Sequence, residues 1–343
     1  MKFKKFILKK RFFITLFSLL ILTTSAYFVY KSINKSNPVV SSSINTVHKL
    51  NTEGYEDNLS FVAIAKNEGP YIKEWIEFHK LVGVTKFYIY DNESTDNLKE
   101  ILQDYIDSGE VVYKYYPGQG KQLVAYQEAI NDYKNKTKYM GFIDLDEFVI
   151  PVENESLTDA IEDIMKKDNK IAGVGINWMI YGSSGLIDKP EGLVTENYKY
   201  RAVNGFGANN HIKTICNPRK VIKPLEPHSF KYEPEYYCVN EDSKKIFGPF
   251  NPGCSYKKLR INHYFSKSQN EYIKKKDRGL ADHTDNLKRT MNDFYAHDKN
   301  DVYDYIMEKY MQKLKTNLDL YASPIIKIPT QFKTFIPKLA AGF

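Results

Sequence analysis

Short apolar runs and segments of helical period alternate along the chain between residues 59 and 150. Continuous apolar runs, typical of strands buried on both faces, lie at 59–65, 86–90, 111–116 and 139–150. The segments between them, 68–82, 97–106 and 120–133, repeat apolar side chains at the spacing of one helix face. This alternation predicts βαβ units, and therefore an α/β fold with a mostly parallel sheet flanked by helices.

The pattern changes after residue 150. Residues 171–265 are richer in Gly and Pro and contain short strand-like pieces such as 171–178 and 211–216. From Ser268 the chain becomes helical and basic, and 301–314 is its clearest amphipathic stretch. We therefore expect one catalytic-size domain over 59–282 and a helical C-terminal extension over 283–343.

Near the N-terminus, residues 12–30 form an apolar segment of nineteen residues without a charge. A helix of this length spans just under the ~30 Å hydrocarbon core, which predicts a single transmembrane helix before the domain. A cleaved signal peptide is the alternative, because Thr24 and Ala26 resemble a cleavage site. The run continues to Tyr30, beyond the usual h-region, and this length favours an uncleaved signal-anchor.

Basic residues set the expected orientation of that segment. Six positive charges lie in residues 1–11, whereas only Lys31 and Lys35 follow the segment closely, so the basic tail is predicted to be cytoplasmic. Residues 31–58 are polar and rich in Ser and Asn, as in a flexible stem. The predicted topology is a single-pass type II membrane protein, in the Golgi of a eukaryote or the inner (cytoplasmic) membrane of a bacterium.

The 343-residue chain has a formal net charge of +7 at pH 7, and six of those excess charges precede residue 12. The remaining chain is near +1 and offers no extended basic face, so we expect no nucleic-acid partner. Three cysteines are too few for a disulfide framework and lack metal-ligand spacing. They fit either one bridge with a spare thiol or three buried thiols.

Asp144 and Asp146 are the strongest chemical signal, because they lie in the longest apolar run. Residues i and i+2 of a strand point to the same face, so the two carboxylates should converge. A buried carboxylate needs a partner, and a divalent cation such as Mg²⁺ or Mn²⁺ suits hard oxygen ligands. The alternative is a strand end whose acids are solvated or paired with Lys or Arg.

A second acid, Asp91, ends the predicted strand 86–90 and precedes a turn and a helix. Ligands bind at the carboxyl ends of parallel strands, and an acid there can accept hydrogen bonds from a nucleotide's ribose or base. The alternative is an ordinary Asx-turn before a helix.

Several segments together resemble glycosyltransferase family 92 and its bacterial relatives, which belong to the GT-A superfamily near family 2. They are AKNE (65–68), EWIEFHKLVGVTKFYIYDNESTDN (74–97), YMGFIDLDEFVIP (139–151), HIKTICNPRKV (211–221), PHSF (227–230) and INHYFSKSQNEYIKKKDRGLAD (261–282). The resemblance covers roughly residues 59–282 and implies a GT-A, Rossmann-like fold. It also implies a metal-dependent hexosyltransferase that uses a UDP-sugar, with galactose as the expected sugar, and inverts at the anomeric carbon. A glycan or glycoconjugate would be the acceptor.

The resemblance also implies roles for individual residues. Asp144 and Asp146 match the D-x-D motif that holds Mn²⁺ or Mg²⁺ against the diphosphate, and either His228 or His263 would complete the metal site. The residues implied to contact the UDP-sugar are Asn67, Glu68, Asp91, Lys213, Lys267 and Arg278. For the three basic residues among them the alternative is solvated surface charge, which is also the preferred interpretation of the lysine run 274–276.

An inverting reaction needs a general base near the acceptor hydroxyl, commonly Asp or Glu. Asp188, Glu191 and Glu196 follow a Ser/Gly loop and are candidates that the sequence does not rank. Trp178, which precedes that loop, could stack on an acceptor sugar, although Trp is more often a core residue.

Two other functions fit part of the pattern. Phosphatases of the haloacid-dehalogenase type also carry D-x-D at a strand end, with the first Asp as nucleophile. They need Thr or Val two residues after the second Asp, on the first strand, and here Phe148 stands at that place after about three earlier strands. The non-enzyme alternative is an inactive membrane-tethered sugar-binding domain, against which the presence of both Asp144 and Asp146 argues.

Overall fold

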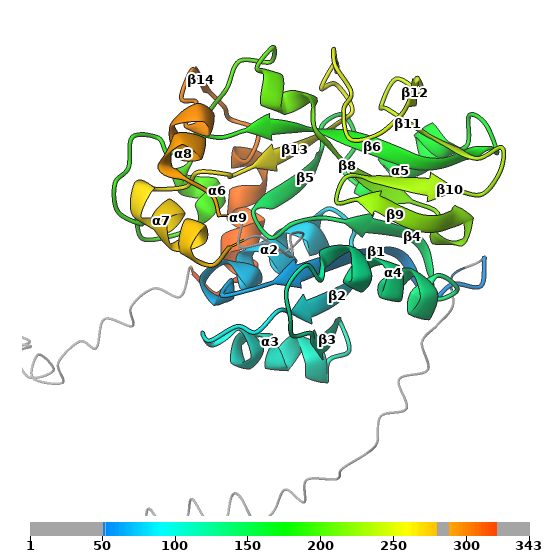
Figure 1. The fold of residues 1–343 in the computed structure, drawn as a ribbon, viewed down its shortest axis with the longest axis horizontal. Helices are drawn as coiled ribbons and strands as arrows, with labels where there is room; N and C mark the ends of the chain where they lie inside the picture. The colour runs from blue at the N-terminus through cyan, green and yellow to red at the C-terminus, as the bar shows by residue number, and fades with distance from the viewer. Residues whose placement is uncertain (1–50, 52, 280–287, 321–343) are drawn as a thin grey trace, which may run out of the picture. The chain divides into compact units, whose positions relative to one another are not determined.

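The computed structural model of the protein describes residues 51, 53–279 and 288–320. These residues contain a mixed ten-stranded sheet whose main path runs β12-β11-β6-β8-β4-β1-β2-β3, with β13 beside β6 and β5 beside β13 (Figure 1). Its strands are β1 (Asp57–Ala65), β2 (Lys86–Asp91), β3 (Val111–Tyr115), β4 (Thr137–Phe142), β5 (Glu147–Pro151), β6 (Ile171–Ile180), β8 (Ile212–Cys216), β11 (Tyr237–Val239), β12 (Lys245–Ile246) and β13 (Leu259–His263).

The first half of this sheet is parallel. β1 pairs with β2 and β4, and β2 pairs with β3, each in parallel register. The connections are α2 (Gly69–Leu81), α3 (Leu98–Asp107) and α4 (Gln122–Tyr133). The predicted βαβ units are confirmed, and the loops that follow β1, β2 and β4 meet at one edge of the sheet.

Alternating side chains divide the core between the two faces of the sheet. Phe61 of β1 and Phe87 of β2 belong to one cluster, to which α2, α3, α5 (Leu157–Met165) and α9 (Glu308–Asn317) contribute. Val62 and Tyr88 belong to the opposite cluster, with α4 and the hairpin β9 (Val221–Glu226)–β10 (Ser229–Tyr232). Because both faces are covered, these strands are apolar throughout, as parallel strands usually are.

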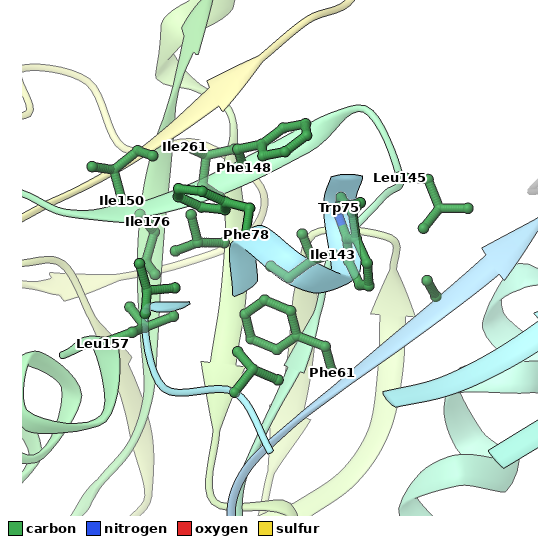
Figure 2. Packing of buried hydrophobic residues seen from close by; sticks show 14 of the residues in the cluster. Phe61, Trp75, Phe78, Ile143, Leu145, Phe148, Ile150, Leu157, Ile176 and Ile261 are labelled. Carbon is green, nitrogen blue, oxygen red and sulfur yellow. The ribbon is translucent and has the colours of Figure 1, made fainter. Parts of the chain in front are cut away.

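An aromatic group in the first cluster supports the site. Figure 2 shows Trp75 and Phe78 of α2 near Phe148 of β5, among aliphatic side chains. The Trp75 indole N–H donates hydrogen bonds to the carbonyl oxygens of Asp144 (3.1 Å) and Glu147 (2.9 Å). A fully buried tryptophan therefore fixes the backbone that carries the D-x-D motif.

The single strand predicted over 139–150 is wrong. The run is two strands, β4 and β5, joined by a turn in which the Glu147 N–H donates to the Asp144 carbonyl at 3.1 Å. The Glu147 carboxylate accepts a hydrogen bond from the Asp144 N–H (2.8 Å), which supplies the partner that a neighbouring strand would otherwise provide. β4 lies between β1 and β8, whereas β5 pairs antiparallel with β13. Strand spacing therefore does not place Asp144 and Asp146 on one face.

Residues 288–320 pack onto the same core as the preceding domain. Tyr310 and Leu314 of α9 lie in the first cluster. The amphipathic stretch 301–314 is only partly helical, because β14 (Val302–Tyr303) pairs antiparallel with β7 (Tyr200–Arg201) before α9 begins. Asp304, just after β14, forms ion pairs with Arg201 and with Arg260 of β13. The remaining helices are α6 (Val194–Asn197), α7 (Gln269–Asp277), α8 (Met291–His297) and the 3₁₀ turns η1 (Gly207–Asn210) and η2 (Pro218–Lys220).

The predicted N-terminal segments lie outside this description. The basic tail (1–11), the anchor (12–30) and most of the stem (31–50 and 52) fall in residues that the structure does not describe, as does the predicted boundary at 282–283. The last two residues of the predicted stem, Asp57 and Asn58, belong to β1. Within 51–279 and 288–320, no helix has the length and apolar character needed to cross a bilayer. Cys216, Cys238 and Cys254 are all free thiols.

Candidate active site

A cavity of about 220 Å³ lies where β1, β2 and β4 end, and we call it the strand-end cavity. The first half of the sheet contributes Glu68, Asn92 and the D-x-D carboxylates to its wall. The second half contributes Trp178 of β6 and His263 of β13, and α7 with the residues after it closes one side. The described residues that line it are Ile64, Ala65, Lys66, Glu68, Asn92, Gln122, Asp144, Leu145, Asp146, Trp178, Pro227, His228, His263, Phe265, Lys275, Arg278, Gly279 and Arg289.

The side chain of Asp144 is held from two sides. Its Oδ1 accepts a hydrogen bond from Gln122 Nε2 (3.0 Å) at the start of α4, and its Oδ2 lies 2.9 Å from Lys213 Nζ of β8. Burial opposes the carboxylate's charge, but Lys213 holds the pKa of Asp144 below its ordinary value. Asp144 is therefore ionised at neutral pH and remains one-third exposed (33%) toward the cavity.

Asp146 faces residues from the distant C-terminal part of the domain. Its Oδ2 forms an ion pair with Lys275 of α7 and lies 3.5 Å from His263 Nε2. Against the effect of burial, Lys275 and His263 hold the pKa of Asp146 well below its usual range. Burial lowers the pKa of His263, which leaves its ring neutral near pH 7, and burial lowers the pKa of Lys275 to about 8.

Lys213 was expected to neutralise the donor diphosphate, but it lies behind the D-x-D turn. It is fully buried, pairs with Asp144 and lies 4.0 Å from Glu147, and it is not among the described residues that line the strand-end cavity. Despite burial, these carboxylates raise the pKa of Lys213. Burial raises the pKa of Glu147 well above its ordinary value, so one lysine charge balances one carboxylate charge, that of Asp144.

The two histidines predicted as metal ligands take different positions. His263 lies beside Asp146, and its Nδ1 has no hydrogen-bond partner among the described residues. His228 lines the same cavity but its Nδ1 lies 2.7 Å from the Ile212 carbonyl, and burial lowers its pKa to about 3. Trp178 packs edge-on against both rings, at centroid distances of 4.3 Å and 5.2 Å. His263 is therefore the histidine whose ring nitrogen lies next to a carboxylate oxygen of the D-x-D motif.

Asp91 and Asn67 hold the loops that follow β2 and β1. Asp91 accepts hydrogen bonds from the Ser94 N–H (2.8 Å) and the Tyr113 hydroxyl (2.6 Å). Asn67, in the left-handed region at φ 55°, accepts one from the Thr95 N–H (2.7 Å). Neither residue lines the described wall of the strand-end cavity, where Asn92 stands instead.

The other predicted donor contacts divide between two places. Arg278 lines the strand-end cavity, pairs with the buried Glu68 and donates to the Lys66 carbonyl at 3.0 Å. Lys267 lines a neighbouring cavity, with its ammonium 3.4 Å from the centroid of the Tyr71 ring.

The three candidate bases lie away from the described wall of the strand-end cavity. Asp188 accepts a hydrogen bond from Asn270 Nδ2 (2.6 Å), and Glu196 pairs with Lys315 of α9. Glu191 binds Asn197 through its backbone carbonyl at 2.8 Å. The general base therefore stays a prediction, with these three residues as its candidates.

Sequence analysis missed several residues of the site. The run 274–276 was interpreted as surface charge, but the middle lysine, Lys275, is buried against Asp146. Its position three residues after Tyr272 was the available signal, because residues i and i+3 share a helix face and an aromatic side chain of a helix usually faces the core. Gln122 and Arg289, which also line the cavity, carried no comparable signal.

Comparison with known proteins now adds to this geometry. Residues 65–318 match the family described as glycosyltransferase family 92. The chain belongs to glycosyltransferase family 92. This family membership gives no support to the phosphatase alternative, and Asp144 follows the fourth strand along the chain, not the first.

The curated relatives of this family 92 chain include plant proteins. A family 92 protein of Ricinus communis is 28% identical over 202 residues, which cover 58% of this chain and 34% of the relative. A family 92 protein of Oryza sativa subsp. japonica is 29% identical over 154 residues, which cover 45% of this chain and 26% of the relative. The chain therefore spans about a third or less of the length of these relatives.

Solved structures show weaker likeness. S. aureus TarS 1–349 is 14% identical, with a TM-score of 0.33 over 54% of this chain and 53% of that chain. Glucosyl-3-phosphoglycerate synthase from Mycobacterium tuberculosis, in a structure with Mn²⁺ and UDP, is 16% identical, with a TM-score of 0.27 over 48% and 58%. At these TM-scores the likeness supports no conclusion about the site of the family 92 chain.

The family 92 site can be tested for its fit to a divalent cation. Among the described residues, no group of three or more His, Cys, Asp and Glu side chains is arranged to hold a metal ion. Asp146 and His263, whose Oδ2 and Nε2 lie 3.5 Å apart, nevertheless supply an oxygen and a nitrogen of the kinds that Mn²⁺ takes as ligands. Lys275 is the present partner of that carboxylate and would have to give way. Mg²⁺ commonly takes one or two protein carboxylates together with substrate phosphates and water, so a site with few protein ligands fits it.

Proposed function

We propose that this chain is a metal-dependent GT-A glycosyltransferase that moves a hexose, with galactose as the expected sugar, from a UDP-sugar to a hydroxyl of a glycan, with inversion. The supporting observation is that the ionised Asp144 and Asp146 share one cavity with His263 and with cations of α7 and its following loop. A site of this kind can take a diphosphate and a divalent cation together. Membership in family 92 supports the same reaction class.

The described cations around the cavity have the chemistry to hold the donor. Lys275, Arg278 and Arg289 line the wall nearest the C-terminal part of the domain. A guanidinium binds phosphate oxygens in a bidentate manner, and a lysine binds them as a point charge. Arg278 and Lys275 would then exchange carboxylate partners for phosphate oxygens when the donor binds.

The implied metal has a defined place in this proposal. Asp146 and His263 are the pair that would hold Mn²⁺ or Mg²⁺. Asp144 is the third ligand that the D-x-D resemblance implies, and it would have to approach the pair, because the three side chains are not arranged as a metal-binding group here. When bound, the metal supplies Lewis-acid neutralisation of the charge that develops on the departing UDP. The chain's own contribution is positioning: Lys213 and Gln122 orient Asp144, and Trp178 and Lys275 border the His263–Asp146 pair.

The experiment is UDP release by the full chain against a panel of UDP-sugars, with Mn²⁺ and with EDTA. We expect turnover with UDP-galactose that falls by at least about a hundredfold in Asp144→Ala and Asp146→Ala proteins and in EDTA. Undiminished turnover in the two variants and in EDTA would refute the metal role. UDP-sugar binding without turnover would instead support the inactive sugar-binding domain.

We also propose that residues 12–30 anchor the protein in a membrane with the N-terminus in the cytoplasm. The supporting observations are the uncharged length of the segment and the excess of basic residues before it. Protease protection of sealed vesicles tests this proposal. Protease added on the cytoplasmic side should leave the domain after residue 58 intact, and degradation of that domain would show the opposite orientation.

A further inference from the structure

A second cavity, of about 360 Å³, adjoins the strand-end cavity, and we call it the Tyr71 cavity. Lys275 and Arg278 line both cavities, so the two are neighbours across α7. Its other walls come from the start of α2, the loop after β2, the loop after β6 and the segment between β13 and α7. Neither Asp144 nor Asp146 belongs to its described wall.

Positive charge dominates this cavity. Of the two acids in its described wall, Glu271 accepts hydrogen bonds from the hydroxyls of Tyr71 and Ser268, and Asp96 accepts from the Gly69 N–H. Both acids therefore already accept hydrogen bonds from other groups of the protein. Three lysines that line the cavity have no carboxylate within 4.0 Å among the described residues: Lys189, Lys267 and Lys274.

Lys267 is the strongest of these observations. It is only 5% exposed, its backbone is in the left-handed region at φ 49°, and its ammonium lies 3.4 Å from the Tyr71 ring centroid. Lys189 lies over the same ring at 4.7 Å. With no described carboxylate within 4.0 Å, the Lys267 charge is balanced only at longer range, by Glu271 and Glu74. Such a buried cation gains from a closer anion, and a left-handed backbone at a non-glycine residue adds strain that a functional site commonly holds.

A neutral donor in the same wall also lacks a partner. Ser266 is 1% exposed and lines the Tyr71 cavity, and its Oγ makes no hydrogen bond with any described residue. An unpaired hydroxyl and an ammonium without a carboxylate within 4.0 Å therefore line the same cavity. Both are hydrogen-bond donors, and a bound oxyanion is an acceptor for each.

We infer that the Tyr71 cavity binds a carboxylate or phosphate group carried by the acceptor, so that the acceptor of this enzyme is an acidic glycan. This inference rests on the proposed function, because it assigns the donor diphosphate to the strand-end cavity. In that cavity the diphosphate would have Lys275, Arg278 and Arg289 and the proposed metal position. Lys275 and Arg278 also border the Tyr71 cavity, whereas Lys189, Lys267 and Lys274 line the Tyr71 cavity alone. The described wall of the Tyr71 cavity contains neither Asp144 nor Asp146. Its positive charge therefore complements a second anion.

Titration of the full chain with matched sugars tests the inference directly. The probes are digalacturonate, neutral digalactose and galactose 6-phosphate, each followed by calorimetry at low and at high salt. We expect an acidic probe to bind at least about tenfold more tightly than digalactose, with a preference that falls as salt rises. The tighter of the two acidic probes identifies carboxylate or phosphate as the recognised group.

Variants locate the site. Lys267→Met should reduce the preference for the acidic probe by about tenfold or more, whereas Lys276→Met, which removes a charge of α7 outside both described cavity walls, should keep it. Lys189→Met provides a second variant if Lys267→Met does not fold. Equal binding of acidic and neutral probes, or an unchanged preference in folded Lys267→Met and Lys189→Met proteins, would overturn the inference.

Separate measurements distinguish the two proposals. UDP binding and UDP release test the donor site, whereas the sugar titration needs no donor. A chain that binds and turns over a UDP-sugar without any acidic preference keeps the proposed function and loses this inference. A chain that fails in UDP binding and turnover loses the proposed function itself.

Discussion

Lys213 shows how a single residue can determine the state of the site without lining it. Its fully buried ammonium contacts Asp144 and lies near Glu147, two carboxyl groups of the D-x-D turn. Removing one partner of a buried ion pair leaves the other charge without compensation. The turn therefore depends on a residue of β8, some seventy positions further along the chain.

Replacement of that lysine tests this dependence. Lys213→Met should lower the free energy of unfolding by about 2–3 kcal/mol, because the ionised Asp144 would lose its cation. The loss is smaller than the ~3–5 kcal/mol of a fully buried pair, since Asp144 is one-third exposed and keeps contact with the cavity. Urea unfolding measures the change, and Lys223→Met, at an exposed position of β9, is the matched control that should stay close to the unchanged protein. A Lys213→Met protein as stable as the control would contradict the described ion pair.

Chemical type could be predicted at the residue scale, but pairing could not. The sequence indicated Asp144 and Asp146 because two acids in an apolar run need partners. It could not show that Lys213 would face Asp144, or that Lys275 would face Asp146, since those partners come from distant elements. Their orientation depends on tertiary packing.

At the scale of elements, α7 connects both cavities. It begins with a capping box in which Ser268 Oγ accepts a hydrogen bond from the Glu271 N–H, and the Glu271 carboxylate accepts one from the Ser268 N–H at 3.1 Å. The same helix presents Lys275 to Asp146, and Arg278 follows it. The N-terminal cap thus sets the position of cations that lie two turns later.

Substitution at the cap gives a prediction with a close control. Ser268→Ala should destabilise the protein by about 1 kcal/mol, because the N–H of Glu271 loses its acceptor, whereas Ser268→Thr should keep most of that stability. Thermal unfolding of the two variants compares them under the same conditions. Equal melting temperatures for the Ala and Thr variants would mean that the cap contributes nothing.

Elements with a local signature were predicted well, and those defined by long-range pairing were not. The helices and strands of the first half follow apolar periodicity closely. The run 139–150 and the stretch 301–314 were each taken as one element, but a turn divides the first and β14 occupies the start of the second. In both cases a partner strand distant in sequence, β13 or β7, determines the break.

At the scale of the whole described domain, Asp304 joins three segments. Its carboxylate contacts Arg201 of β7 and Arg260 of β13 from the C-terminal part of the chain. Burial raises the pKa of Asp304, but Arg260 and Arg201 together hold that pKa below its ordinary value. A carboxyl with a depressed folded-state pKa stabilises the fold above its unfolded pKa, and this contribution is lost as pH falls through the folded-state value.

The pH dependence follows from that sign. Asp304→Asn should reduce the free energy of unfolding by about 3 kcal/mol at pH 7, and the deficit should shrink as pH falls below about 4. Urea unfolding from pH 7 to pH 3 measures both proteins, and Asp163→Asn, at an exposed ion pair, should show no measurable change at either pH. A deficit that is constant with pH would show that the charge of Asp304 is not its source.

The turn between β4 and β5 also limits how the chain can vary in length. β4 is fixed in register against β1 and β8, and β5 is fixed against β13, so both flanks of residues 143–146 are held independently. One inserted residue would reverse the facing of every side chain in β5 or displace both acids, since strand facing alternates. Relatives that share this fold should therefore align here without gaps, which makes these four positions a fixed reference point for aligning distant members of the family.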